Sequence, residues 1–358
     1  MNEKELIRER LHRNGLNAPF NSITDCVYAL SGIQSQFQQF AEVSILNRCK
    51  KAPKLQEFQK LYEDHGIINL WGQRHTLHMY TPEDWNLICD IYHDAFFPKA
   101  YQERFLQDFE QMMAKIEHDS FEEGYINKSR ILEILVNQLG HEQLENDYID
   151  YMLIRHCCAM GLMFGVPAKP SIKQFGSYSA IKSPRWAFDG DALKALEDIM
   201  KRYFKSYGPA TLQDFCHWSG LSLGLAKTVF LRVEHELGVK TLNDRTYYTF
   251  GEAEPAASNK LYLLGKFDPL FVSYKHKDWI VTRAQELEIW KSAARVEAVV
   301  LDGTNVIGTW RHSLKGNKMS INICPMANIS AACDKRIKSK AEKLALFWKK
   351  ELDAITYA

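Results

Sequence analysis

Two glutamines, two residues apart, are the first side chains in this sequence whose type and spacing suggest chemistry. Gln34 and Gln36 lie in the segment SGIQSQFQQF, residues 31–40. A primary amide is a poor base, but its carbonyl oxygen accepts a hydrogen bond from water and points a negative dipole end at a developing cation, while its NH2 group donates. Residues two apart can converge where extended chain enters the first turn of a helix. Gly32 places both glutamines at such an entrance.

The same segment also fits a purely structural interpretation. Polar residues on one face of a surface helix are commonplace. The glutamines at 34, 36, 38 and 39 would then form a solvated face over a core of Phe37, Phe40 and Ala41. On these residues alone this interpretation is favoured, so only motifs elsewhere in the chain can favour chemistry at Gln34 and Gln36.

A second polar set lies in IINLWGQRHTLHMY, residues 67–80, which we interpret as a wing of two strands. Period-two alternation places Arg74, Thr76, His78 and Tyr80 on one face. Arg74 could hold a phosphate or a base, and Thr76 and His78 could orient a glutamine or a water by hydrogen bonds. A histidine satisfied within the structure explains His78 equally well, and His75 on the other face is interpreted as structural.

An order of three helices and a hairpin is clearest from Asp191 onward. An apolar stripe at helical spacing ends at the Gly-Pro pair 208–209, Thr211 begins a second helix with the capping-box pattern TLQD, and Ser222 can cap a third. The strands VKTL and TYYTF follow, joined by a turn at 243–245. This order predicts a winged helix-turn-helix.

The same order recurs towards the amino terminus. Residues 2–13, 22–30 and 35–50 are predicted to be helices, and 67–80 to be their wing. A less regular third copy is expected after residue 122, with 85–122 as a helical spacer. The predicted domains are therefore 1–122, 123–190, 191–255 and 256–358.

After Pro255 the sequence alternates as strands do, in LYLLGKF, FVSYK, DWIV, ARVEAVVL, NVIGTWR and KMSINI. We expect a small antiparallel β-barrel, closed by a basic helix over 334–353. Asp268 before a proline is interpreted as a turn-former. Trp310 and Arg311 are expected to end a strand beside the basic stretch 312–318, which includes Lys315. These side chains and the lysines and arginine of the final helix could contact a phosphate backbone, although such surfaces are usually only solvated.

Composition restricts the class of protein without choosing a function. The chain has 358 residues, 46% of them hydrophobic, and its 45 Lys and Arg balance 44 Asp and Glu, so any nucleic-acid surface must be local. Eight cysteines include no CxxC pair and no cluster with His at ligand spacing, so we expect reduced thiols, no metal and no cofactor. The charged amino terminus and the lack of long apolar runs predict a cytoplasmic, nucleoid-associated protein.

Several of these segments together resemble one family. LSGIQSQ followed by LWGQRHTLHMYTPEDW, then GPATLQDFCHWSGL, LLGKFDPLFVSYKHK and LDGTNVIGTWRH, is similar in order to the AlkZ/YcaQ winged-helix DNA glycosylases, over nearly the whole chain. The resemblance implies three tandem winged helices, a carboxy-terminal β-barrel and cleavage of the N-glycosidic bond of N7-alkylated guanine, including interstrand crosslinks. The family motif of two glutamines around a usually apolar residue is matched by Gln34, Ser35 and Gln36, as in the AlkZ branch, and Arg-x-Thr-x-His by Arg74, Thr76 and His78.

The chemistry of amides agrees with this resemblance. Nucleoside hydrolysis passes through an oxocarbenium-like sugar, so the protein must place a water, stabilise positive charge and help the base to leave. Neutral amides suffice only for a base that already leaves well. Alkylation at N7 makes the purine cationic, and its departure needs no protonation. The glutamines therefore predict cationic alkylpurines as substrates, and exclude uracil and 8-oxoguanine.

The resulting hypothesis is an α+β, mainly helical, monomeric DNA glycosylase acting on double-stranded DNA in repair. Because the sequence places no lysine beside the glutamines, we expect hydrolysis without lyase activity. A non-catalytic winged-helix DNA-binding protein or transcription regulator is the alternative, and a scaffold of winged helices is a third class. The recognition helix QSQFQQFAEVS is not basic, which argues against a regulator.

Overall fold

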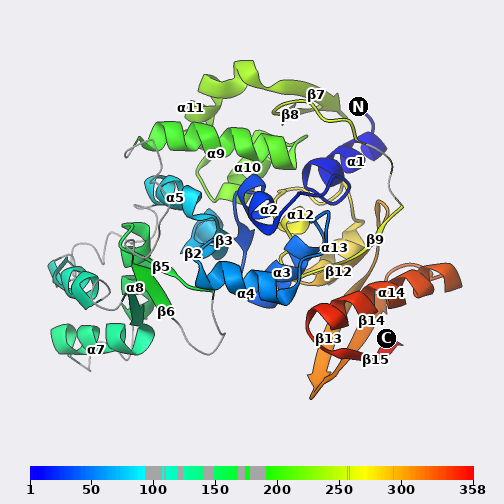
Figure 1. Ribbon diagram of the computed structural model, residues 1–358. Coiled ribbons are helices and arrows are strands. Elements are labelled where there is room, and N and C mark those ends of the chain that lie inside the picture. The colour runs from blue at the N-terminus through cyan, green and yellow to red at the C-terminus, as the bar shows by residue number, and fades with distance from the viewer. Residues whose placement is uncertain are drawn as a thin grey trace. The chain divides into compact units, whose positions relative to one another are not determined.

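The computed structural model describes residues 1–92, 107–108, 110–119, 124–140, 149–167, 174–177, 191–255, 257, 259–292 and 294–358. Contacts divide the chain into two compact units, one made of Met1–Phe58 with Ile199–Ala358 and the other of Gln59–Asp198 (Figure 1). This grouping does not follow the four domains predicted from the sequence, which remain predictions.

The first unit begins with three helices, α1 (Glu3–Arg13), α2 (Ile23–Ala29) and α3 (Gln38–Leu46). Asn2 and Glu5 form a capping box at α1, and Ser22 caps α2. The helix expected over 35–50 is shorter, because the chain before it is extended as β1 (Ile33–Gln34) and Phe37 is the N-cap residue. A helix that the sequence analysis did not predict, α4 (Leu55–Glu63), follows.

The helix-helix-helix-hairpin order expected after residue 191 is present. It consists of α9 (Ala192–Tyr207), α10 (Leu212–Ser219), α11 (Leu223–Val233), the 3-10 turn η5 (Glu234–Glu236), β7 (Gly238–Leu242) and β8 (Arg245–Thr249). Thr211 completes the predicted capping box with Asp214, and Ser222 caps α11. Asn243 and Asp244 both have positive φ, which the tight hairpin turn requires. Local signals were therefore sufficient in this part of the chain.

The carboxy-terminal part of the first unit is an open sheet. Its strands pair in the order β15 (Glu351–Tyr357), β14 (Lys318–Pro325), β13 (Asn305–Lys315), β12 (Ala298–Asp302) and β9 (Leu261–Leu264). In the part of the chain that the structure describes, the outer strands β15 and β9 do not pair, so the expected closed barrel is not confirmed. The sheet is not wholly antiparallel either, since β14 and β15 run parallel. Helix α14 (Ala331–Phe347) packs against the sheet, as Figure 1 shows.

Two of the predicted strands of this region are wrong. The segment FVSYK falls partly in the short helix α12 (Pro269–Val272), because Asp268 caps it and Pro269 occupies its first turn. DWIV lies in a turn before α13 (Arg283–Ile289). The remaining strands there are short, β10 (Trp290–Lys291) and β11 (Arg295–Val296). The predicted final helix is in fact α14, which ends earlier and is followed by the unpredicted β15.

The second unit has a mixed architecture. Its elements are β2 (Ile68–Trp71), the 3-10 turns η1 (Gln73–His75) and η2 (Pro82–Asp84), β3 (Leu77–Tyr80), α5 (Trp85–Tyr92), β4 (Tyr125–Asn127), α7 (Lys128–Leu139), α8 (Ile149–Ala159), β5 (Met163–Gly165) and β6 (Gln174–Ser177). Residues 110–119 are also helical.

The strands of the second unit pair in the order β3-β2-β5-β6-β4. Asn69 of β2 lies opposite Gly165 of β5, so the predicted first wing belongs to one sheet with the strands of the next predicted domain. Parts of the predicted helical spacer and the Gly- and Ser-rich segment up to Pro184 lie outside the described residues. None of the helices described is long and apolar enough to cross a membrane.

A buried ion pair fixes α3 in the first unit. The guanidinium of Arg48, just after α3, contacts the carboxylate of Asp268 through two hydrogen bonds of 2.6 and 2.8 Å. Ser44 of α3 donates to the same carboxylate, and Arg48 also donates to the side chain of Asn14 at the end of α1. Both charged side chains are almost fully buried. The predicted turn-former Asp268 therefore caps α12 and also joins α12 to α1 and α3.

We expect Asp268→Ala to lower the free energy of unfolding of the protein by about 3–5 kcal/mol, because Arg48 would remain buried without its counter-charge. Urea denaturation followed by fluorescence measures this loss. The matched control is Glu286→Ala, which removes an exposed ion pair with Arg283 and should cost less than about 0.5 kcal/mol. Equal costs for the two variants would contradict this role. The double variant Arg48→Met with Asp268→Leu should be more stable than Asp268→Ala alone.

Candidate active site

The two glutamines converge at the approach to α3. Ser31 and Gly32 have φ values of 52° and 94°, which turn the chain after α2 into the short extended segment β1. Gln34 ends that segment and Gln36 lies in the turn before the helix. The Nε2 of Gln34 donates to the Oε1 of Gln36 over 3.3 Å. Gln34 is buried and Gln36 is exposed, so the pair extends from the interior of the protein to its surface.

This hydrogen bond decides which amide atoms can act on a substrate. The Gln36 carbonyl accepts from Gln34 and, with two lone pairs, can accept a second hydrogen bond from a water. The Gln36 NH2 group takes no part in the bond between the glutamines. The neighbouring Gln38 donates to the buried Glu42 one turn along α3, over 3.1 Å, whereas Gln39 is exposed on the helix surface. The distinction between the first and second pair of glutamines therefore has a structural basis.

An aromatic surface that the sequence analysis missed lies beside Gln36. Phe37 is 48% exposed, and its ring stacks on that of Phe267 with a centroid separation of 6.0 Å and an interplanar angle of 13°. The Nζ of Lys266 is 6.0 Å from the centroid of the Phe37 ring. Phe37 is adjacent to Gln36 in sequence, but Phe267 comes from the loop after β9. Only the tertiary fold brings this loop to the start of α3.

Lys266 also changes the expectation that no lysine lies near the glutamines. Its Nζ is ion-paired with the buried carboxylate of Glu297 over 3.2 Å, and Arg311 contacts the same carboxylate over 3.4 Å. An ammonium in such a pair has no lone pair with which to attack a sugar. The pairing with Glu297 thus favours a purely electrostatic role for Lys266.

The structure separates the three barrel residues expected at a phosphate backbone. Trp310 is fully buried and its indole Nε1 donates to the carbonyl of Leu264, so its side chain does not face DNA and that prediction is wrong. Trp310 and Arg311 lie within β13, paired with β12 and β14, and do not end a strand. Arg311 is largely exposed, and Lys315 lies exposed at the end of β13 opposite Lys318.

In the second unit, Arg74 and Thr76 do not follow the expected strand alternation. Arg74 and His75 have φ values of 54° and 57° within η1, a conformation uncommon for residues with a side chain. Thr76 ends this turn, and its hydroxyl donates to the carbonyl of Gln73 over 3.1 Å. A Cβ at Gly72 would collide with the Tyr80 hydroxyl, which donates to the Gln73 side chain. Gly72 in the middle of the segment was the available signal for a turn.

His78 lies in β3 and is a buried, neutral histidine. Burial, and then the charge of Arg74, lower the pKa of His78 to about 3, although its hydrogen bond to the Thr76 carbonyl opposes the shift. The Nδ1 atom lies 2.8 Å from that carbonyl oxygen and must therefore carry the proton. Nε2 is left as a hydrogen-bond acceptor. Such a histidine can accept a hydrogen bond from a water, but it is not an acid.

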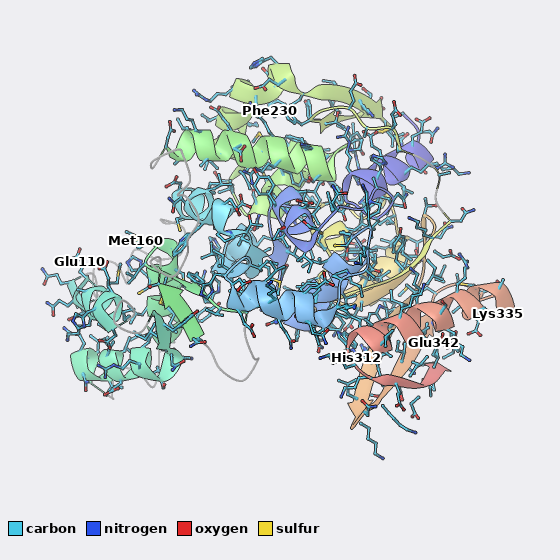
Figure 2. The ribbon with its side chains drawn as sticks, viewed as in Figure 1. Glu110, Met160, Phe230, His312, Lys335 and Glu342 are labelled. Atoms are coloured by element: carbon cyan, nitrogen blue, oxygen red, sulfur yellow. The ribbon has the colours of Figure 1, made fainter. Side chains whose placement is uncertain are left out.

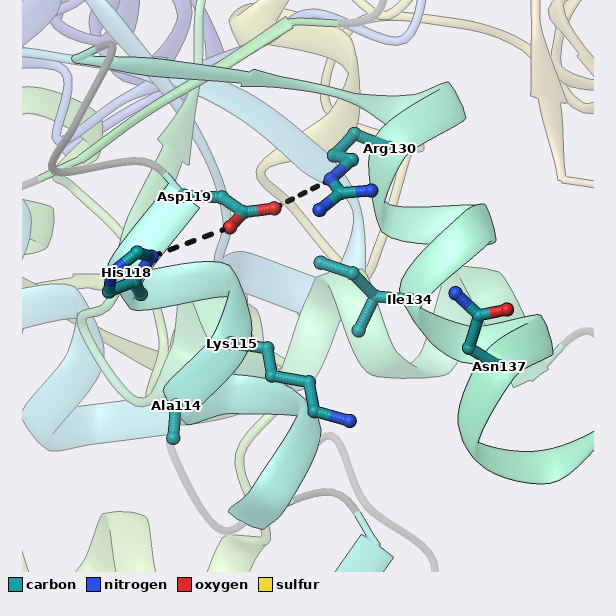
Figure 3. Close-up of a pocket in the computed structure, with 7 residues that line it drawn as sticks. All are labelled: Ala114, Lys115, His118, Asp119, Arg130, Ile134 and Asn137. Carbon is teal, nitrogen blue, oxygen red and sulfur yellow. Dashed lines mark hydrogen bonds and ion pairs between the residues drawn. The ribbon is translucent and has the colours of Figure 1, made fainter.

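Charged side chains that line a shallow pocket in the second unit form ion pairs with their neighbours. Figure 3 shows Asp119 between His118 and Arg130. The Asp119 carboxylate lies 2.6 Å from the Arg130 Nε and 3.7 Å from the His118 Nδ1, and Arg130 also contacts Glu133. Arg130 is thus paired with two carboxylates at the surface, and we assign no chemistry to the pocket.

The comparisons with known proteins identify the class. A sequence model of the family described as "DNA glycosylase AlkZ-like" matches residues 27–347, so the chain belongs to this family of DNA glycosylases. An interstrand DNA cross-link repair glycosylase of Streptomyces sahachiroi is 21% identical over 310 residues, covering 81% of this chain and 82% of the relative. The solved structure of the S. sahachiroi DNA glycosylase AlkZ has a TM-score of 0.79 at 16% identity and covers 100% of both chains. The two proteins thus share a fold.

We expect the stability of the protein to fall as the pH decreases from about 6.5 towards 3, in part because of His78. In this window the unfolded chain binds a proton at His78, whose ordinary pKa is 6.5, whereas the folded chain does not until about pH 3. The loss of thermal stability between pH 7 and pH 5 should be smaller in His78→Gln than in the wild type. His118→Gln, at an exposed position, is the control and should behave as the wild type. The same loss in all three proteins would contradict this assignment.

Proposed function

We propose that the chain hydrolyses the N-glycosidic bond of cationic N7-alkylpurines in double-stranded DNA, with Gln34 and Gln36 as its catalytic residues. The observation that supports this most is the pair of hydrogen-bonded amides before α3 in a chain of the AlkZ-like family. Amides match this reaction because they supply dipoles and hydrogen bonds but no proton. A purine that carries a positive charge leaves as a neutral molecule and needs none.

In the proposed reaction, the Gln36 carbonyl accepts a hydrogen bond from the attacking water and turns its negative end towards the oxocarbenium-like sugar. Gln34 holds the Gln36 amide in place through their shared hydrogen bond. The water adds to the anomeric carbon as the bond to the purine nitrogen breaks. Its proton passes to solvent, and the bonding electrons leave with the base.

The aromatic surface of Phe37 and Phe267 is proposed to hold a base or a sugar beside the glutamines. An exposed aromatic ring stacks on nucleic-acid bases, each of which has a π-face. Arg311 and Lys315 are proposed to contact phosphates of the DNA. Arg74 of the second unit is proposed to contact DNA by its charge, and Thr76 and the buried, neutral His78 to orient a water by hydrogen bonds.

The proposed substrates include interstrand crosslinks. The S. sahachiroi relative is named an interstrand DNA cross-link repair glycosylase. A purine crosslinked through N7 carries the same positive charge as one with a methyl group there, so the amide chemistry applies to both. The product of the proposed reaction is an intact abasic site, because the ammonium of Lys266 is ion-paired with Glu297.

Release of 7-methylguanine from duplex DNA tests the proposal. The wild type should release the base, while Gln36→Ala and Gln34→Ala should each lower the rate about 100-fold with little change in DNA affinity. Uracil-containing duplex should remain intact. If DNA is bound but neither 7-methylguanine nor a crosslinked guanine is released, the proposed activity is wrong and the chain is a DNA-binding protein. Cleavage of the abasic strand by the wild type would contradict simple hydrolysis.

Phe37 provides a second test at the same site. Phe37→Ala should weaken binding of lesion-containing DNA by about 1–3 kcal/mol if a base stacks on this ring, whereas Phe37→Tyr should keep most of the affinity. Fluorescence anisotropy with duplexes that carry 7-methylguanine on a 2′-fluoro sugar, which resists hydrolysis, measures the difference. Leu314→Ala, which removes another exposed apolar side chain at the β13–β14 hairpin, is the control. Equal effects of Phe37→Ala and Leu314→Ala would argue against stacking.

A further inference from the structure

A groove lined by lysines lies in the first unit, at the end of α3 away from the glutamines. Its volume is about 780 Å³, and its walls come from the end of α3, the segment 49–56, β9 and α14. The nine residues of α3 span roughly 13 Å at 1.5 Å per residue, so the groove is separate from the candidate active site. Of the residues predicted to take part in catalysis or DNA binding, only Lys340 and Lys343 of the final helix line it.

The charge of the groove has one sign. The residues that line it include six lysines and no aspartate or glutamate: Lys50, Lys54, Lys260, Lys340, Lys343 and Lys349. The charges act on one another, since burial, and then Lys343 and Lys260, lower the pKa of Lys340. Gathering like charges around a concave surface opposes folding, and it attracts a ligand of opposite charge.

The groove also has an apolar floor. Val43, Leu263 and Leu344 line it, together with Phe347 and the exposed Leu346. Leu346 is 76% exposed, the largest exposed fraction among the large apolar side chains that the structure describes. Covering an exposed leucine beside an apolar groove with a partner removes apolar surface from water, which favours binding.

Helix α14 carries both features on one face. Lys340 lies three residues before Lys343 and four before Leu344, and Phe347 lies four residues after Lys343 and three after Leu344, so the four point to the same side of the helix. Lys335, Lys338 and Glu342 of the same helix do not line the groove; Figure 2 labels Lys335 and Glu342. The basic face of the final helix is thus divided between a part inside the groove and a part outside it.

These features fit a peptide better than a phosphate backbone. Sites for a DNA backbone are built from arginine, lysine, polar side chains and backbone N–H groups, and they offer little apolar surface. An amphipathic helix instead inserts large apolar side chains into an apolar groove while its flanking charges pair with the rim. Of the two ligands, only the peptide uses both the apolar floor and the lysines.

We propose that this groove binds an acidic amphipathic helix of a partner protein, whose apolar residues cover Leu346 and the groove floor and whose Asp and Glu side chains pair with the six lysines. The site is independent of the glycosylase chemistry. It would let a second protein dock on the enzyme while the glutamines remain accessible.

The test uses the full chain and a fluorescent peptide of about 18 residues that places Leu on one helical face and Glu on the others. The control peptide has the same composition in a shuffled order that forms no apolar face. We expect the amphipathic peptide to bind and the shuffled one to bind at least about tenfold more weakly, with affinity falling as salt rises. Equal binding of the two peptides would overturn the proposal.

Matched variants locate the site. Lys343→Glu with Lys349→Glu, both exposed in the groove, should weaken peptide binding at least about tenfold, and Leu346→Ala about fivefold. Lys335→Glu with Lys338→Glu reverses two exposed charges of α14 outside the groove and should leave the affinity unchanged. Thermal unfolding verifies that each variant folds. The proposal fails if both double variants have the same effect, or if the groove variant loses affinity for a 20-mer duplex instead of the peptide.

Discussion

The ion pair between Arg48 and Asp268 is the constraint on which the first unit depends. It joins the end of α1, the carboxy-terminal end of α3 and the start of α12, and all its partners are buried. Charges without water around them tolerate few arrangements, because each donor must meet an acceptor. The helix that follows the glutamines is therefore held at its far end by a network that fixes both its position and its rotation. Gly265 completes this constraint, since a Cβ there would lie 2.8 Å from the Phe40 carbonyl and push the loop away from α3.

The proposed active site, made of neutral amides, differs in its dependence on pH from a site that uses a general acid. Carboxylates and histidines change charge with pH, whereas glutamines present the same dipoles at any pH at which the protein is folded. His78 also stays neutral, because burial and then Arg74 lower its pKa to about 3. The ammonium of Lys266, which lies near the ring of Phe37, is ion-paired with Glu297, and Arg311 pairs with the same carboxylate. Such a site suits a substrate that already carries a positive charge. The amides add no net charge, so any electrostatic field comes from the surrounding residues.

Short patterns in the sequence predicted most of the helix caps and turns. The caps at Thr211 and Ser222, the turn at 243–244 and the approach of Gln34 and Gln36 to a helix follow from short patterns. The errors arose where contacts with residues distant in the sequence determine how a side chain is placed. Trp310 is buried because β13 is long and pairs on both sides, and Phe267 stacks on Phe37 although the two are far apart in sequence. At Arg74 and at α12, Gly72 and the Asp268-Pro269 pair were local signals that the alternation of apolar residues obscured.

The first unit is built from two separate stretches of the chain, and this affects how the protein folds during synthesis on the ribosome. Residues 1–58 belong to the same compact unit as residues 199–358, and Arg48 is separated from Asp268 by 220 positions. At synthesis rates of about 5–20 residues per second, Asp268 emerges roughly 10–45 seconds after Arg48. Until then Arg48 lacks its partner, and the apolar side chains of α3 that are buried in the folded protein stay exposed to aggregation. A nascent chain therefore cannot anchor α3, and with it the segment of Gln34 and Gln36, until about three quarters of the chain has been made.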